Sequence, residues 1–90
     1  MATTSSTTID FGAGATDTSA FVSAPAISAA SMVEAWVFPA DTATNTADGH
    51  FFEGLIVMAG NVVEGSGFTI YARCREGLAH GSYTIGWVHT

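Results

Sequence analysis

Basic side chains are almost missing from this 90-residue sequence, which has no lysine and only two arginines, Arg73 and Arg75. Against them stand eight carboxylates, so the formal net charge is −6. Binding that depends on neutralising phosphates is therefore excluded, which argues against nucleic acid and against anionic membranes as partners. Charged residues of both signs make up only 11% of the chain and hydrophobic residues 48%. The sequence predicts an unusually apolar surface.

Cysteine is also scarce, because Cys74 is the only one. An internal disulfide framework is excluded, and Cys74 fits a core position in a strand better than the role of a nucleophile. A chain of this length forms one domain with a small core. Without a disulfide, such a domain needs another source of stability. We therefore expect it to assemble as a homo-oligomer or against a larger partner.

Long apolar runs are absent as well. No stretch approaches the roughly 18 apolar residues that span a bilayer, and the first residues lack the basic and apolar regions of a signal peptide. We expect a soluble protein made in the cytoplasm. No metal, cofactor or membrane is predicted as a partner.

Helical periodicity is lacking throughout, whereas alternation is clear in two segments. In residues 68–75 the apolar side chains of Phe68, Ile70, Ala72 and Cys74 share one face. Residues 83–88 alternate in the same way, so each segment predicts a half-buried strand. Residues 32–38 carry large apolar groups on both faces and stop at Pro39. This pattern predicts a strand covered on both sides, either central in a sheet or at an interface.

The rest of the chain is divided by turn residues. Residues 1–8 are almost wholly Ser, Thr and Ala and predict a flexible arm, which leaves residues 9–90 as a single β-domain. Residues 12–15 suit a hairpin connection, residues 39–49 a long exposed loop, and residues 50–58 a strand with a bulge at Gly54. In total, six to eight short strands predict a small all-β, antiparallel sandwich, jelly roll or barrel.

Metal and nucleotide motifs fail on spacing. Gly12-Ala13-Gly14 resembles the start of a dinucleotide-binding turn, but Asp17 stands where the third glycine belongs. A calcium loop that began at Asp41 would place Thr46 at its glycine position. The looser group of Asp48, His50 and Glu53 fits solvated loop charges better than a metal site.

Catalytic groupings are equally weak. Ser66 lies in a Gly-Ser-Gly turn without the pattern of a nucleophile elbow. His80 and Ser82 are near each other only because they share a turn, and Glu34 and Glu53 suit edges or interfaces better than a hydrolytic cleft. We expect no catalytic residue and no enzyme.

Aromatic residues are the remaining candidates for function. Trp36, Tyr71, Tyr83 and Trp87 would suit a glycan-binding platform, although such residues in β-proteins more often form core or subunit contacts. The predicted interface residues are Trp36, Phe38, Phe52, Tyr71 and Trp87.

Several segments are similar to short proteins of tailed bacteriophages. The resemblance rests on Val33-Glu34-Ala35-Trp36-Val37-Phe38-Pro39, Asp48-Gly49-His50, Ala59-Gly60-Asn61, Gly65-Ser66-Gly67-Phe68-Thr69-Ile70-Tyr71-Ala72 and the strand from Tyr83 to Val88. It covers most of the chain after residue 8. Its motifs are turns and strand cores, so it implies a place in the virion and transfers no functional residue. In such phage proteins, the loop that contains Asp48-Gly49-His50 usually continues into an acidic stretch. In this sequence, Asp48-Gly49 stands there before His50.

Together, composition and resemblance predict a virion structural protein, with a capsid decoration, or cement, protein as the leading interpretation. Its partners would be the major capsid protein or another virion protein and further copies of itself. The predicted contacts are the aromatic residues given above, with residues 1–8 as an arm across a neighbour. The alternative is a tail or fibre module that binds a host receptor or glycan through residues 39–49 and an aromatic platform.

Overall fold

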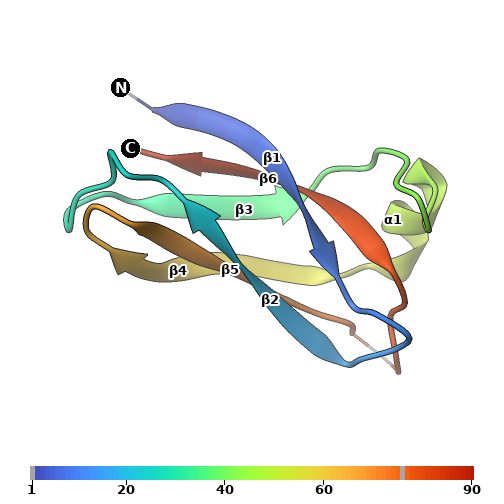
Figure 1. Ribbon diagram of the computed structural model, residues 1–90. Coiled ribbons are helices and arrows are strands. Elements are labelled where there is room, and N and C mark those ends of the chain that lie inside the picture. The colour runs from blue at the N-terminus through green and yellow to red at the C-terminus, as the bar shows by residue number, and fades with distance from the viewer. Residues whose placement is uncertain (1, 76) are drawn as a thin grey trace.

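The computed structural model describes residues 2–75 and 77–90 and contains two three-stranded antiparallel sheets packed face to face (Figure 1). The first sheet has the order β1-β6-β3, formed by Thr3–Asp10, Ser82–His89 and Val33–Val37. The second has the order β2-β5-β4, formed by Asp17–Ser23, Gly67–Arg73 and Ile56–Val63. One short helix, α1 (Ala47–Glu53), lies at one end. The predicted all-β sandwich is confirmed.

The core lies between the central strands β5 and β6, whose alternation predicted it. Phe68, Ile70 and Ala72 of β5 face Tyr83, Ile85 and Trp87 of β6, and all six side chains are buried. The rings of Phe68 and Trp87 meet edge to face with centroids 5.4 Å apart. Cys74 was predicted to fill a core position. It packs against this core but is only partly buried.

The expected flexible arm is instead a strand. Strand β1 pairs with β6 over its whole length, from Thr3 opposite His89 to Asp10 opposite Ser82. A run of Ser and Thr has no apolar pattern, yet its backbone can still complete a hydrogen-bonded ladder, and Thr favours extended structure. The prediction of an arm over residues 1–8 is wrong for the described part, and Met1 lies outside the described residues.

The turn after β1 does not make a hairpin. Its glycines take up positive φ angles, and Gly12 N donates to Asp10 Oδ1 at 2.7 Å. The chain then crosses from the first sheet to the second, where β2 pairs with β5 and not with β1. The turn was predicted correctly, but local spacing could not show that the next strand belongs to the other sheet.

Strand β3 is an edge strand, so the prediction that both its faces are covered is wrong for the single chain. Its inner side chains, such as Ala35, pack against the core, while Met32, Trp36 and Phe38 are exposed on the other face. The alternative reading of this segment as an interface strand stays a prediction.

Helix α1 replaces the first part of the strand predicted over residues 50–58. Thr46 caps its N-terminus by accepting a hydrogen bond from Gly49 N at 3.1 Å. Gly54 ends the helix in a left-handed conformation, with φ of 63°, and is therefore a C-cap rather than a bulge. Seven residues are too few for a clear helical period.

The sequence Ala59-Gly60-Asn61 is typical of a turn, but the structure places it inside β4, so a prediction of a turn there is wrong. The strand register shifts there between Gly60 and Val63, so an irregularity within a strand produced the turn-like sequence. Within the described residues, no helix is long and apolar enough to cross a membrane.

Candidate functional site

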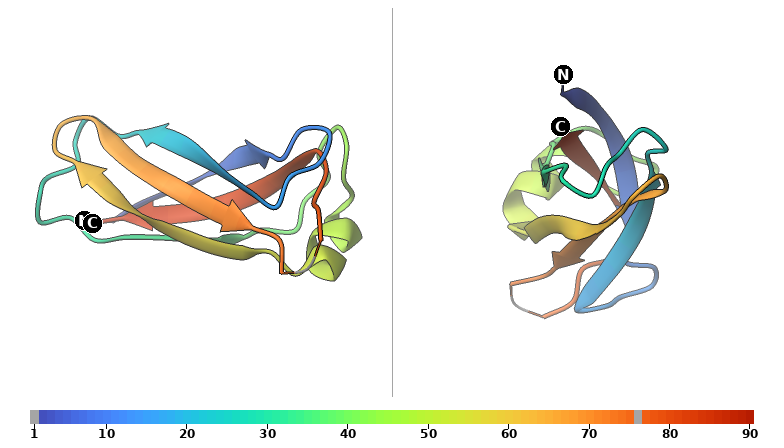
Figure 2. Two further views of the ribbon diagram at one scale, coloured as in Figure 1. Left: turned by 90° about the horizontal axis from the view of Figure 1, so that it is seen from below. Right: turned by 90° about the vertical axis from the view of Figure 1, so that its left-hand side faces the viewer.

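The most distinctive surface is a set of exposed apolar side chains along β3 and α1, which we call the apolar strip. Its members are between 42% and 82% exposed: Met32, Trp36, Phe38, Phe51 and Phe52. Strand β3 runs toward the end of the molecule at which α1 lies (Figures 1 and 2). Large exposed apolar groups on neighbouring elements are typical of a partner-binding surface.

Trp36 lies across the outer face of the first sheet. Its register partner on β6 is Gly86, and a Cβ atom on that glycine would overlap the indole ring. The missing side chain therefore lets the indole lie directly on β6. One side of the ring contacts the sheet, and the side chain remains 42% exposed.

Phe38 and α1 are joined through β6. Phe38 N donates to Thr84 O at 3.0 Å, and Thr84 N donates to His50 Nε2 at 2.8 Å. Because Nε2 accepts, the imidazole is neutral with its proton on Nδ1, which donates to Thr46 O at 2.7 Å. His50 is only 1% exposed. It anchors the helix next to the end of β3.

The same helix turns two phenylalanines outward. With His50 on its buried side, Phe51 and Phe52 point into solvent. Their ring centroids lie 5.6 Å apart at an interplanar angle of 69°. Neither ring belongs to the core cluster, so this pair adds exposed aromatic surface at little benefit to the fold.

The suggested grouping of Asp48, His50 and Glu53 is not a metal site in this structure. Both imidazole nitrogens of His50 bond to the backbone, as described above. Glu53 Oε1 accepts a hydrogen bond from Cys74 Sγ at 3.0 Å. Among the residues that the structure describes, no three His, Cys, Asp or Glu side chains gather around a common point.

Glu53 also affects Tyr83, which is 2% exposed. Burial raises the pKa of the Tyr83 phenol above its ordinary 10.0, and the nearby Glu53 carboxylate raises it further. Folding therefore favours the protonated phenol.

This shift predicts a loss of stability in alkali. Above pH 10.0, the ordinary pKa, tyrosine in the unfolded chain loses its proton before the folded Tyr83 does. The free energy of unfolding is therefore expected to fall as pH rises above 10, and to be insensitive to this group below that pH. Urea unfolding between pH 8 and 11 measures the slope. Tyr83→Phe should flatten it, whereas an equal slope in both proteins would contradict the assignment.

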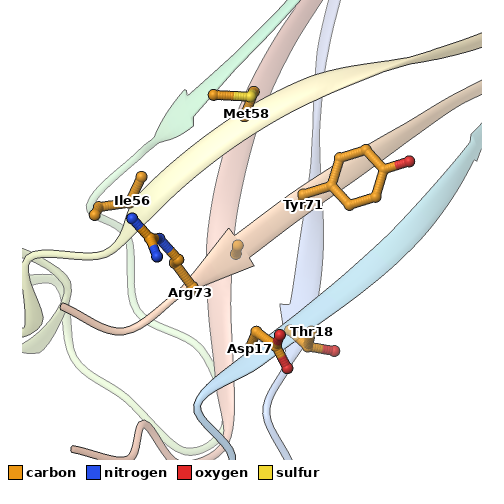
Figure 3. Close-up of a pocket in the computed structure, with 7 residues that line it drawn as sticks. Asp17, Thr18, Ile56, Met58, Tyr71 and Arg73 are labelled. Carbon is orange, nitrogen blue, oxygen red and sulfur yellow. The ribbon is translucent and has the colours of Figure 1, made fainter. Parts of the chain in front are cut away.

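Tyr71 lies on the opposite side of the sandwich from the apolar strip. With Ile56, Met58 and Arg73 it lines a shallow hollow of about 210 Å³ on the second sheet (Figure 3). The Arg73 side chain points toward Ile56, and Tyr71 points away from it. The structure therefore does not bring Tyr71 together with the other predicted interface residues.

Trp87 is part of the core, so its prediction as an interface residue is corrected. It is 8% exposed and stacks on His89, with ring centroids 5.8 Å apart. Tyr83 is buried too, and Tyr71 and Trp36 occupy different sheets. The four aromatics proposed as a glycan platform thus share no surface, because alternation within β6 turns two of them inward.

The loop over residues 39–46 is held down by its own polar groups. Thr42 Oγ1 donates to Ser82 O at 2.8 Å, and Asn45 Nδ2 donates to His80 O at 2.9 Å. The side chains that suggested a binding loop therefore serve to attach it to the start of β6.

Sequence reasoning placed Trp36, Phe38 and Phe52 among the candidates, and the structure locates all three on the apolar strip. It missed Met32 and Phe51. The available signal for Met32 was the outward parity it shares with Trp36, whereas Phe51 required knowledge of the helix. No known protein family, curated protein or solved structure matches the chain.

Proposed function

We propose that this chain is a non-enzymatic structural protein of a bacteriophage virion, and that it decorates and stabilises the assembled capsid. The observation that carries the proposal is the apolar strip, which presents five large side chains to solvent on a chain with net charge −6. A free protein gains nothing from such exposure. A shell protein that covers the strip would gain apolar burial.

The arrangement of the strip suits docking onto a rigid surface. Trp36 and Phe38 are fixed to the sheet, and α1 is held in place by His50. Carboxylates lie among the apolar groups, with Glu34 between Met32 and Trp36 on the same face of β3 and Asp48 in the first turn of α1. Protein interfaces usually combine apolar contacts with polar groups of this kind.

Stabilisation would follow from mass action. A protein that binds the assembled shell and not its separated subunits shifts the equilibrium toward the shell. The contribution grows with the number of occupied sites, so many weak contacts are sufficient. The proposed role needs no catalysis, cofactor or metal.

The location of the protein tests this proposal directly. Virions are separated into heads and tails, and calibrated peptides give the copy number in each fraction by mass spectrometry. Hundreds of copies that follow the major capsid protein are expected. A few copies confined to tails, or absence from the virion, would overturn the decoration role.

A matched pair of phenylalanine variants tests the strip. Phe52→Ser is expected to weaken binding to expanded capsids by at least about tenfold, because it removes an aromatic contact at the proposed interface. Phe21→Ser is the control, since Phe21 is 57% exposed but lies on the second sheet. Both proteins should fold as the wild type does. Equal binding by the two variants would contradict a role for the strip.

The receptor-binding alternative has one observation in its favour. The partly exposed indole of Trp36 packs over Gly86 on the outer face of the first sheet, and such a surface suits stacking against a sugar ring. A receptor module would be found in tails and would bind host cells as an isolated protein. A decoration protein would bind expanded capsids and leave cells unbound.

A further inference from the structure

Among the residues that the structure describes, strand β1 has one hydrogen-bonding edge without a partner. It lies at the border of the first sheet and, within that part of the chain, pairs with β6 alone. Within residues 2–75 and 77–90, no backbone hydrogen bond joins β1 to β2, the strand that follows it. The N–H and C=O groups on the other side of β1 are therefore free to bind a further strand.

This edge lacks the usual protection against pairing. Thr3 to Ile9 contain no charge, proline or glycine, and pairing with β6 runs without a bulge. The other edges differ, because β2 begins with Asp17, β3 carries Glu34 and β4 contains a register shift. Proteins normally block exposed edges with such features. Seven consecutive residues without them, Thr3 to Ile9, are suited to accept a partner strand.

We propose that β1 pairs antiparallel with β1 of a second copy of this chain. The two first sheets then form one six-stranded sheet with the order β3-β6-β1-β1-β6-β3. This size is ordinary for a sheet. We expect so small a domain to self-associate. The pairing of β1 names the surface through which it would do so.

The charge distribution favours a second copy as the occupant. Two chains of net charge −6 repel unless they meet where carboxylates are absent, and β1 has none before Asp10. With the two-fold axis at Ser6, the two Asp10 residues lie about 26 Å apart, at roughly 3.3 Å per residue. That separation exceeds the Debye length of about 8 Å at physiological ionic strength, so their repulsion is screened.

The side chains also match across this axis. Residues of equal parity face the same side, so Ser6 meets Ser6 and Thr4 meets Thr8 on the outer face. On the inner face, Ser5 meets Thr7. All are hydroxyl side chains, and Thr pairs stabilise antiparallel strands. Ser5 is exposed although it points toward the same side as the buried Trp87, its neighbour on β6. The second sheet thus leaves this part of β1 uncovered.

This interface lies at the opposite edge of the first sheet from β3. A dimer would therefore carry an apolar strip at each end of its sheet. Two strips on one body would bind a repeating shell with higher avidity than one. This last consequence rests on the proposed function, whereas the dimer itself does not.

Sedimentation equilibrium of the purified chain is the first test, and a dimer is expected. Ser5→Lys places two positive charges close to the axis, one from each copy. Their repulsion should raise the dimer dissociation constant at least tenfold. Ser23→Lys, at an exposed position of β2, is the matched control and should leave it unchanged. Circular dichroism checks that each variant is folded. A monomeric wild type, or a dimer unaffected by Ser5→Lys, would overturn the proposal.

Cross-linking tests the predicted register in the same protein. In a Cys74→Ser background, Ser6→Cys should form a disulfide-linked dimer under mild oxidation, because the two positions face each other. Ser19→Cys on β2 should remain monomeric under the same conditions. Dimers linked through residue 19 and not residue 6 would place the interface on another edge. Loss of capsid binding would leave both results unchanged, so the two proposals fail separately.

Discussion

Phe68→Ala is expected to destabilise the fold by about 3–5 kcal/mol, the usual cost of removing a fully buried phenylalanine. Phe68 is 0% exposed and contacts Trp87 edge to face, and it lies on the central strand of the second sheet. Truncation removes apolar contacts to both sheets at once. A chain of this size has a total stability of roughly 5–13 kcal/mol. The variant should therefore lose a large share of its stability and unfold at a clearly lower urea concentration than the wild type.

Urea denaturation of wild type, Phe68→Ala and Phe21→Ala measures this effect. Phe21 is a matched control, because it pairs with Thr69 of β5 but points outward and is 57% exposed. Its truncation should cost less than about 1 kcal/mol. Equal losses from the two substitutions would mean that the packing between the sheets does not dominate stability.

His50→Leu is expected to cost about 1–3 kcal/mol, the usual cost of a donor left without a partner, and to release α1 from the sheet. Leucine fills much of the space of imidazole but leaves Thr84 N without its acceptor. Thr46 O loses the imidazole but keeps the hydrogen bond from His50 N. Because α1 carries Phe51 and Phe52, the strip should lose its defined shape as well.

Two further histidine variants separate anchoring from general loss of a histidine. His50→Gln keeps an acceptor that can reach Thr84 N and should recover part of the stability. His80→Leu alters an exposed histidine outside the helix and should change stability by less than about 1 kcal/mol. Amide hydrogen exchange over residues 47–53 shows whether the helix is released. Unchanged protection in His50→Leu would contradict the anchoring role.

The sandwich could be predicted because its two central strands carry a strong alternating pattern. Phe68, Ile70 and Ala72 on β5 and Tyr83 and Ile85 on β6 are inward in both the sequence pattern and the structure. Central strands contribute both a buried face and a ladder on each side, so selection for packing leaves a clear period in the sequence.

Strand β1 and helix α1 could not be predicted for different reasons. In β1, only Ile9 is buried, so strand formation depends on backbone pairing with a segment more than 70 residues away. In α1, the outward Phe51 and Phe52 break the rule that apolar residues are buried. Their side chains made a helix resemble a strand.

The candidate site was predicted in part. Trp36, Phe38 and Phe52 were identified because large aromatic residues stood out in a sequence with little charge. Parity could not distinguish Trp87 from Trp36, because each belongs to an alternating strand and only the packing of the sheets decides which face is inner. Their opposite orientations follow from register, since Trp87 is opposite Ala35 and Trp36 is opposite Gly86.

The position of β6 in the first sheet has a consequence for how the protein folds during synthesis. Among the strands of residues 2–75 and 77–90 it comes last along the chain, yet it lies between β1 and β3 and is the ladder partner of both. Until the ribosome has released it, β1 and β3 have no template, whereas β2, β4 and β5 can already pair. The Ser and Thr side chains of β1 are polar, so this strand can stay hydrated while it is still unpaired. Folding should therefore occur in two stages, with closure of the first sheet as the final, non-local step.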